Sequence, residues 1–500
     1  MPRAKRLSPL LPGRLLAALA GLVLPLAFAP FGQYWVAPLA LCMLFATWNV
    51  PPGEAARRGF LFGTGAFAAG TWWLYVSVRL VGGTPLPVAV LLLVGLVALM
   101  AAWYAACGYL ASRWSTASLA FDACVLIPGL WVLAEWLRGW IFSGFPWLSI
   151  GYAMVDGRLA AWAPLGGVHG ATLATAILAG AVLVLFRGRT VDRAVASVVL
   201  LALTLATWIL GGQAWTTPAG APLRVSLVQG AVPQLLKWEP SEQLATMEHY
   251  FEATAALRNQ DLIVWPEAAV PAPDDWVGNY LEGLRGLASE LHAQLLVGIL
   301  THDLERDEYH NSLLALGEEA GVYHKRHLVP FGEFFPVPAF VRSWMRMANL
   351  PFDDITAGSR QQRPLLAAGV PLAPTICYED AYGAEQLAFL PEARLLVNVS
   401  NDAWFGDTIA PHQHLQIARM RALETGRYMV RSTNTGITAI IDQRGRVQAL
   451  APQFEPWVLS GLAQPYEGAT PYVRMGNYPV VLFGLLGLAA ALLIRRRDGN

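Results

Sequence analysis

Charged residues are scarce in this 500-residue sequence. Asp, Glu, Lys and Arg make up 14% of it, against about 25% in typical soluble domains, and the formal net charge is zero. The sequence also lacks a basic stripe and any nucleic-acid recognition motif. Because no excess positive charge is available to meet a phosphate backbone, we expect no nucleic-acid partner.

Cysteine is also rare, with four in the chain. Three of them lie in apolar segments, where a thiol behaves as a small hydrophobic side chain, and only Cys377 lies in a segment of soluble composition. No second cysteine accompanies it there, and no Cys or His pairing has zinc-ligand spacing. We therefore expect neither a disulfide at Cys377 nor a metal site. By count alone, this lone thiol is either an inert structural residue or a reactive one.

Apolar residues are abundant, at 55% of the chain with a mean hydropathy of +0.42. They concentrate in residues 1–212 and 479–494. A helix needs about 20 such residues to cross a bilayer, so we predict a multi-span α-helical membrane domain. The eight predicted spans are 10–29, 35–49, 59–78, 86–111, 119–137, 166–186, 193–211 and 479–494.

Basic residues set the expected orientation of these spans. They gather before the first span, in alternate loops after it, and behind the last span. Because such loops stay on the cytoplasmic side, both termini are expected in the cytoplasm. The predicted domains are a seven-span membrane domain (1–212), a periplasmic domain (213–478) and an eighth span with a cytoplasmic tail (479–500). The predicted location is the inner membrane of a bacterium, in a multi-pass arrangement.

The outward loop 138–165 is rich in aromatic and turn residues, including the run Ser143-Gly-Phe-Pro-Trp147. One interpretation is an aromatic belt at the lipid–water interface. The other is a loop that lines a lipid entry path on the side of the soluble domain. The sequence leaves both open.

Segment 213–478 alternates strands and helices, among them a helix at about 411–426, and this order is typical of an α/β domain. Three predicted strands end in polar residues of different types: Glu267, Lys325 and Cys377. Singly, each is explained as a loop or surface residue. Together, a carboxylate, a cation and a thiol form a set that can activate a nucleophile.

These residues lie in three motifs that resemble a known superfamily. Trp-Pro-Glu267, Lys325-Arg-His-Leu-Val-Pro-Phe-Gly-Glu333 and Cys377-Tyr-Glu look like the signatures of the nitrilase, or carbon–nitrogen hydrolase, superfamily. The resemblance covers about 223–462 and implies an αββα sandwich with a Glu267–Lys325–Cys377 triad. The membrane frame resembles one branch of that superfamily, the bacterial apolipoprotein N-acyltransferases, which carry such a domain between the last two of eight spans.

The resemblance implies ping-pong acyl transfer without a metal or organic cofactor. Glu267 would take the proton of Cys377, and the thiolate would attack a phospholipid ester. Lys325 and the backbone N–H of Tyr378 would stabilise the oxyanion. The resulting thioester on Cys377 would then acylate the α-amino group of the N-terminal S-diacylglyceryl cysteine of an apolipoprotein.

Supporting residues follow from the same motifs. Glu333 and Glu379 are expected to orient Lys325 and the cysteine loop, or else to form structural ion pairs. Trp238 matches an aromatic position that the family uses near substrate, but alone it would be an ordinary core or surface tryptophan. Residues 337–350 carry apolar side chains at helical spacing, which favours either a membrane-dipping lid or a helix packed on its own domain.

Two other functions compete with this interpretation. A membrane-anchored amidase or nitrilase would share the triad but would need one anchor rather than seven preceding spans. A transporter with a binding or sensing domain would need ionisable residues along a path through the spans, and their centres contain few. Acylation of a lipopeptide, measured against release of ammonia, separates the acyltransferase from the amidase.

Overall fold

The computed structural model describes residues 10–330, 332–334 and 355–497. Its internal contacts divide the chain into two compact units. A helical unit comprises Met1–Trp215, Asp407–Thr425 and Thr470–Asn500, and a sheet unit comprises Thr216–Gly406 and Gly426–Ala469. The segment 337–350, with its predicted lid or packed helix, lies outside the described residues.

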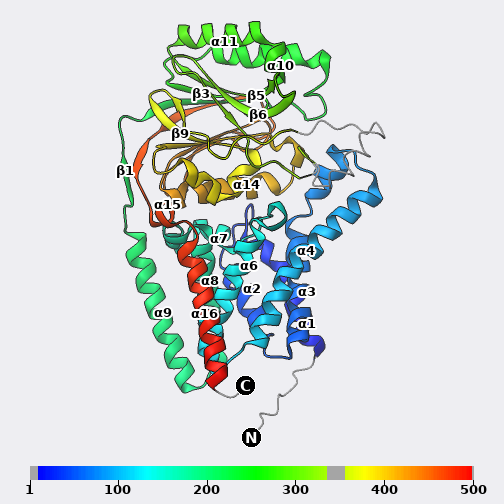
Figure 1. Cartoon of the computed structure of the whole chain (residues 1–500), viewed down its shortest axis with the longest axis vertical. Helices are drawn as coiled ribbons and strands as arrows, with labels where there is room; N and C mark the ends of the chain where they lie inside the picture. Colours follow the sequence, from blue (N-terminus) through cyan, green and yellow to red (C-terminus); the bar gives the residue numbers. More distant parts are fainter. Residues whose placement is uncertain (1–9, 331, 335–354, 498–500) are drawn as a thin grey trace. The chain divides into compact units, whose positions relative to one another are not determined.

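The helical unit has a helix, or a pair of consecutive helices, at each predicted span. Its longer helices, with the short helices η1 and η3 that adjoin α1 and α6, are α1 (Leu10–Val23), η1 (Leu24–Ala27), α2 (Val36–Phe45), α3 (Pro52–Gly70), α4 (Leu86–Arg113), η3 (Asp122–Leu126), α6 (Ile127–Arg138), α8 (Ala163–Arg187), α9 (Thr190–Gly211) and α16 (Tyr478–Arg497). Shorter helical turns are η2 (Val76–Val81), α5 (Leu119–Phe121), η4 (Ile141–Ser143), α7 (Ile150–Ala153), η5 (Met154–Asp156), η6 (Arg158–Trp162) and α15 (Pro471–Met475). Figure 1 shows the long helices running alongside one another.

Five of the described helical segments are long and apolar enough to cross a bilayer. They are Leu86–Arg113, Leu119–Arg138, Arg158–Arg187, Thr190–Gly211 and Tyr478–Arg497. The first three predicted spans correspond to weaker candidates. The helices at the first two are short, and α3 carries Glu54, Arg57 and Arg58, which are costly in hydrocarbon. The prediction of a multi-span helical region is supported for five helices, and the count of eight stays a prediction.

Helix α14 (Ala410–Thr425) also belongs to the helical unit, where it packs against α7 and α8. Gln413 Oε1 accepts hydrogen bonds from the indole N–H groups of Trp73 (3.2 Å) and Trp147 (3.0 Å). Glu424 Oε2 accepts from the backbone N–H of Val168 at 2.9 Å, just after α8 breaks at Gly167 (φ 63°). Buried polar side chains therefore fix α14 within this unit.

Arg138 holds the aromatic loop 138–165 through several hydrogen bonds. This guanidinium is 1% exposed and donates to the carbonyls of Phe145 and Trp147 and to Ser149 Oγ. Trp147 is 1% exposed, so it is a core residue and forms no part of an interfacial belt. Trp140 is 54% exposed, and for that residue both the belt and the entry path stay open.

The sheet unit contains two large sheets in its described residues. One has the order β13 (Val447–Leu450), β12 (Ala439–Ile441), β11 (Met429–Thr433), β10 (Leu395–Ser400), β9 (Val370–Ile376), β8 (Leu365–Ala367). The other has the order β14 (Trp457–Ala463), β2 (Leu223–Gln229), β3 (Leu262–Val264), β5 (Gln294–Asp303), β6 (Glu308–Leu316), β7 (Gly321–His324), with β4 (Val270–Pro273) beside β5. A small antiparallel pair joins β1 (Thr216–Pro218) and β15 (Tyr466–Gly468).

The two large sheets face each other. The Ser432 hydroxyl of β11 donates across to the carbonyls of Val228 in β2 and Val264 in β3. Helices α10 (Pro240–Ala255) and α11 (Gly278–Leu291) cover the outer face of the sheet that contains β3, β5 and β6 (Figure 1). Their apolar faces join a core of strand residues. The two facing sheets of the predicted sandwich are thus present, with a helix layer from the same unit on one of them.

Each large sheet contains a set of parallel strands, and their direction fixes where the following loops lie. Strands β2, β3 and β5 are mutually parallel, as are β9, β10 and β11. Parallel strands end at the same edge of a sheet. The pairing therefore fixes the edge at which the chain leaves β3 in one sheet and the edge at which it leaves β9 in the other. The segments that follow these two strands carry Glu267 and Cys377.

Candidate active site

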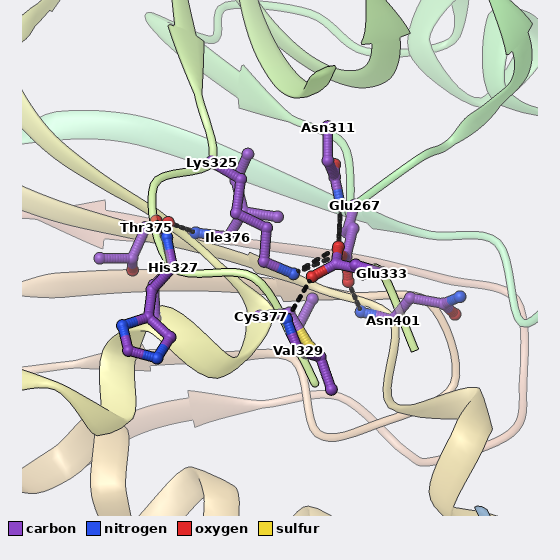
Figure 2. A network of polar contacts seen from close by, with 12 residues as sticks. Glu267, Asn311, Lys325, His327, Val329, Glu333, Thr375, Ile376, Cys377 and Asn401 are labelled. Carbon is purple, nitrogen blue, oxygen red and sulfur yellow. Dashed lines mark hydrogen bonds and ion pairs between the residues drawn. The ribbon is translucent and has the colours of Figure 1, made fainter. Parts of the chain in front are cut away.

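The three residues singled out at strand ends converge in the sheet unit. Glu267 lies in the turn after β3, Lys325 directly follows β7, and Cys377 directly follows β9. Figure 2 shows the three side chains gathered with Glu333. Their exposed fractions are 7%, 1% and 9% for Glu267, Lys325 and Cys377, so water has little access to the thiol.

Lys325 is held by two carboxylates. Its Nζ donates to Glu333 Oε1 at 2.8 Å and to Glu267 Oε1 at 3.3 Å. Burial alone would lower the pKa of Lys325, but the charges of Glu333 and Glu267 outweigh it and hold the pKa above its ordinary value. Lys325 is therefore a fixed cation in a nearly dry site.

Glu267 is oriented by donors from separate segments of the chain. Its Oε1 accepts from Asn311 Nδ2 at 2.8 Å as well as from Lys325, and its Oε2 accepts from the backbone N–H of Asn401 at 2.8 Å. A Cβ at Gly298 of β5 would lie 2.1 Å from the carbonyl oxygen of Pro266, so only glycine lets this turn approach β5. The carboxylate is thus fixed in place before any substrate binds.

Cys377 occupies a strained turn. It begins the short helix η8 (Cys377–Ala381) with φ 53°, in the left-handed region that a side chain disfavours by about 1–3 kcal/mol. Burial raises the pKa of the Cys377 thiol well above its ordinary value, the charge of Glu267 raises it further, and Lys325 opposes both. The thiol consequently rests protonated. Attack on a carbonyl requires a base that removes its proton.

Glu379 joins the segment that carries Lys325 to the turn that carries Cys377. Its carboxylate accepts from the backbone N–H groups of Arg326 (2.7 Å) and Ile376 (2.7 Å) and from the hydroxyl of Tyr323 (2.9 Å). Because Arg326 follows Lys325 and Ile376 precedes Cys377, one buried carboxylate sets the spacing of the cation and the thiol.

A second buried network supports the cysteine turn. Arg431 of β11 donates to Asp380 Oδ2 at 3.2 Å, to Asp402 Oδ2 at 2.9 Å and to the side-chain oxygen of Asn398. The amide of Asn398 in turn donates to the carbonyl oxygen of Cys377 at 3.3 Å. Sequence reasoning missed Arg431 and Asn398, since each lies inside a buried strand and belongs to none of the three motifs.

The other predicted residues take different positions. Trp238 has a 42% exposed side chain, whereas its neighbour Lys237 is 2% exposed and donates from Nζ to the carbonyl oxygen of Glu267 at 3.0 Å. Lys237, which the sequence did not single out, is thus the member of this pair that contacts Glu267, and the expected place of Trp238 near substrate stays a prediction. Tyr378 lies in the first turn of η8, and the centroid of its ring is 5.1 Å from that of the Tyr382 ring.

No group of three His, Cys, Asp or Glu side chains in the described part of the chain is arranged to hold a metal ion. The triad itself supplies a thiol, a carboxylate and an ammonium. Asn311 and Asn401, to which the sequence assigned no chemical role, complete the set by fixing the carboxylate. Such a set can form and release a covalent acyl-enzyme.

Comparisons with known proteins cover nearly the whole chain. Residues 20–181 match the apolipoprotein N-acyltransferase N-terminal domain, and residues 224–469 match the carbon–nitrogen hydrolase family. Apolipoprotein N-acyltransferase of Methylococcus capsulatus is 45% identical over 494 residues, which is 97% of each chain. That of Azotobacter vinelandii is 42% identical over 499 residues, covering 97% of this chain and 96% of its own. A solved nitrilase-superfamily structure from Saccharomyces cerevisiae matches with a TM-score of 0.38 and 17% identity, over 51% of this chain and 93% of its own.

Proposed function

The chain belongs to the apolipoprotein N-acyltransferase family, and from this premise we propose how its buried site transfers an acyl chain. The family resemblance predicted from three motifs is confirmed, and the protein is an acyltransferase of lipoprotein maturation with a carbon–nitrogen hydrolase domain. We propose that the acyl donor is a membrane phospholipid. The proposed acceptor is the α-amino group of the N-terminal S-diacylglyceryl cysteine of an apolipoprotein.

The first proposed step forms a thioester. Glu267 accepts the thiol proton, and Cys377 Sγ attacks the ester carbonyl carbon of the phospholipid. The negative charge on the carbonyl oxygen is stabilised by Lys325 and by the backbone N–H of Tyr378. When the tetrahedral intermediate collapses, the C–O bond breaks, Glu267 returns its proton to the departing oxygen, and a lysophospholipid leaves.

The second proposed step transfers the acyl chain to nitrogen. The acceptor amine attacks the thioester carbonyl, and Glu267 accepts a proton from that nitrogen. Collapse breaks the C–S bond and expels the sulfur of Cys377, which recovers the proton from Glu267. The product is the N-acylated lipoprotein. Water would compete with the amine at the thioester, and the low exposure of all three residues supports transfer over hydrolysis.

The membrane arrangement is a further part of the proposal. Eight spans would place the segment 213–478 in the periplasm of a bacterium and both termini in the cytoplasm. Single cysteines test this, for example Glu305→Cys at an exposed position of the sheet unit and Asp498→Cys in the tail. We expect a membrane-impermeant maleimide to label Glu305→Cys in spheroplasts and to label Asp498→Cys only after lysis. The opposite pattern would overturn the proposed orientation.

The observation that carries this function is the contact of Lys325 with Glu267 and Glu333 in a buried site that also holds Cys377. The test uses the purified full chain with phospholipid and a synthetic diacylglyceryl lipopeptide. We expect phospholipid-dependent N-acylation that is lost in Cys377→Ala. Release of ammonia from small amides without lipopeptide acylation would instead identify a membrane-anchored amidase.

A further inference from the structure

The active site contains a second buried ammonium that the mechanism above does not use. Lys237 lies in the segment between β2 and α10, its side chain is 2% exposed, and its Nζ is 3.0 Å from the carbonyl oxygen of Glu267. Lys237 therefore contacts the main chain of Glu267, the proposed general base.

Lys237 differs from Lys325 in how its charge is balanced. Lys325 has two carboxylate oxygens within 4.0 Å, but no Asp or Glu in the described ranges forms an ion pair with Lys237. The charged and titratable groups that act on Lys237 are Glu267, in the turn after β3, and Cys377, in the turn after β9. Burial lowers the pKa of Lys237 to about 8, against the opposing effect of those two groups.

The segment that carries Lys237 is fixed to the site by side chains. Asn434 accepts from the backbone N–H of Val232 at 2.9 Å and donates to its carbonyl at 2.7 Å. Asn401 donates from Nδ2 to Gln234 Oε1 at 2.7 Å, while its own backbone N–H donates to Glu267. The general base and Lys237 are thus positioned by one set of contacts.

The charge count around the triad explains why a second cation would matter. Two carboxylates, Glu267 and Glu333, face the single ammonium of Lys325, so this group carries one net negative charge when ionised. A net negative charge opposes the build-up of negative charge on sulfur and on the substrate oxygen. An ammonium without a carboxylate partner in a buried site favours that build-up, because an unpaired buried charge is costly.

We propose that Lys237 is a second cationic residue of the acyl-transfer site, which stabilises negative charge on Cys377 Sγ and on the oxygen of the tetrahedral intermediates. This inference rests on the function proposed above. Lys237 adds no covalent step: it remains protonated throughout, and the proton of the thiol still passes to Glu267. Its influence extends to any acyl donor, since the charge that it stabilises forms at the ester carbonyl.

The test compares Lys237→Met and Lys237→Arg with the unaltered full chain. The rate of acyl-adduct formation on Cys377 is measured by mass spectrometry from pH 6 to pH 10. Two donors are used, a phosphatidylethanolamine and a p-nitrophenyl fatty-acid ester that has no phosphate. At pH 7 we expect Lys237→Met to be slower with both donors, on the order of 100-fold.

The pH profile distinguishes charge stabilisation from a purely structural contact. We expect the rate of the unaltered protein to fall above about pH 8, as Lys237 loses its proton. Lys237→Arg should retain its rate to higher pH, because a guanidinium stays protonated there. An alkaline limb at the same pH in Lys237→Arg would overturn the inference.

Two further outcomes also contradict the inference. Equal rates in Lys237→Met and the unaltered chain would show that the charge is not used. A defect confined to phosphatidylethanolamine would show that Lys237 binds the donor phosphate and does not act at the carbonyl. Should Lys237→Met fail to fold, the profile of Lys237→Arg still decides. Absence of any adduct in the unaltered protein would instead refute the proposed function itself.

Discussion

The ammonium of Lys325 lies 2.8 Å from Glu333, closer than the 3.3 Å that separates it from Glu267. Glu333 therefore provides the closer anchor for the cation. Asn311 donates to both carboxylates and holds them at a fixed separation. This arrangement leaves Glu267 able to exchange a proton with the thiol without releasing Lys325.

Removing the charge of Glu333 should weaken the oxyanion site without changing its volume. In Glu333→Gln, Lys325 keeps Glu267 as its one carboxylate partner among the described residues and is drawn toward it. We expect the rate of thioester formation to fall on the order of 100-fold, as for the loss of an oxyanion donor. Single-turnover mass spectrometry of the Cys377 adduct measures this rate. Glu305→Gln, at an exposed carboxylate, is the matched control and should be unaffected.

Because Cys377 rests protonated, we expect Glu267→Gln to have opposite effects on alkylation of the thiol and on acyl transfer. Burial and the charge of Glu267 both raise the pKa of the thiol, so alkylation by iodoacetamide should be slow at pH 7 and should rise with pH. Glu267→Gln removes one of these effects and lowers the pKa. We expect faster alkylation at a fixed pH but little or no acyl transfer. Slower alkylation in this variant would contradict the assigned electrostatics.

Glu379 should matter for the stability of the sheet unit as well as for activity. Glu379→Ala would leave the buried backbone N–H groups of Ile376 and Arg326 without their acceptor. We expect a loss of about 3 kcal/mol in unfolding free energy, together with loss of activity. Denaturant unfolding, followed by near-ultraviolet circular dichroism, measures the first quantity. A stable but inactive variant would mean that Glu379 acts on the chemistry alone.

Glu424 predicts a pH dependence of stability in the helical unit. Burial raises the pKa of this α14 carboxyl to about 7 against the charge of Arg421, whereas an unfolded glutamate titrates near pH 4.3. The folded state therefore holds more protons between these values, and stability falls as pH rises through that window. Glu424→Gln cannot titrate but retains an acceptor for Val168. It should gain up to about 3 kcal/mol on the unaltered protein between pH 4 and pH 8. If the thermal-unfolding midpoints of the two proteins changed with pH by the same amount, this prediction would be contradicted.

Local sequence patterns predicted much of this structure. Apolar runs placed a helix at each predicted span, and polar residues after predicted strands located Glu267, Lys325 and Cys377. Long apolar runs and strand ends are local features of the sequence, so they can be recognised without knowledge of the tertiary fold. The predicted number of spans is less well supported, because α3 is long enough to cross a membrane but carries three charged residues.

Residues whose role depends on tertiary contacts could not be found this way. Lys237, Asn311 and Asn401 reach Glu267 from three separate segments, and no periodicity marks them. Helix α14 shows the same limit. Its Gln413 and Glu424 would be placed on the surface from polarity alone, yet they are 3% and 0% exposed because other segments of the helical unit supply their partners.

The central claim is that a lipid acyl chain is carried on Cys377. The most direct measurement is mass spectrometry of the Cys377 peptide after the full-length protein is incubated with a phospholipid of defined acyl chains and no acceptor. The account predicts an adduct with the mass of one acyl chain, released by neutral hydroxylamine, cleared on addition of lipopeptide and absent in Cys377→Ala. Full lipopeptide acylation by Cys377→Ala would contradict it.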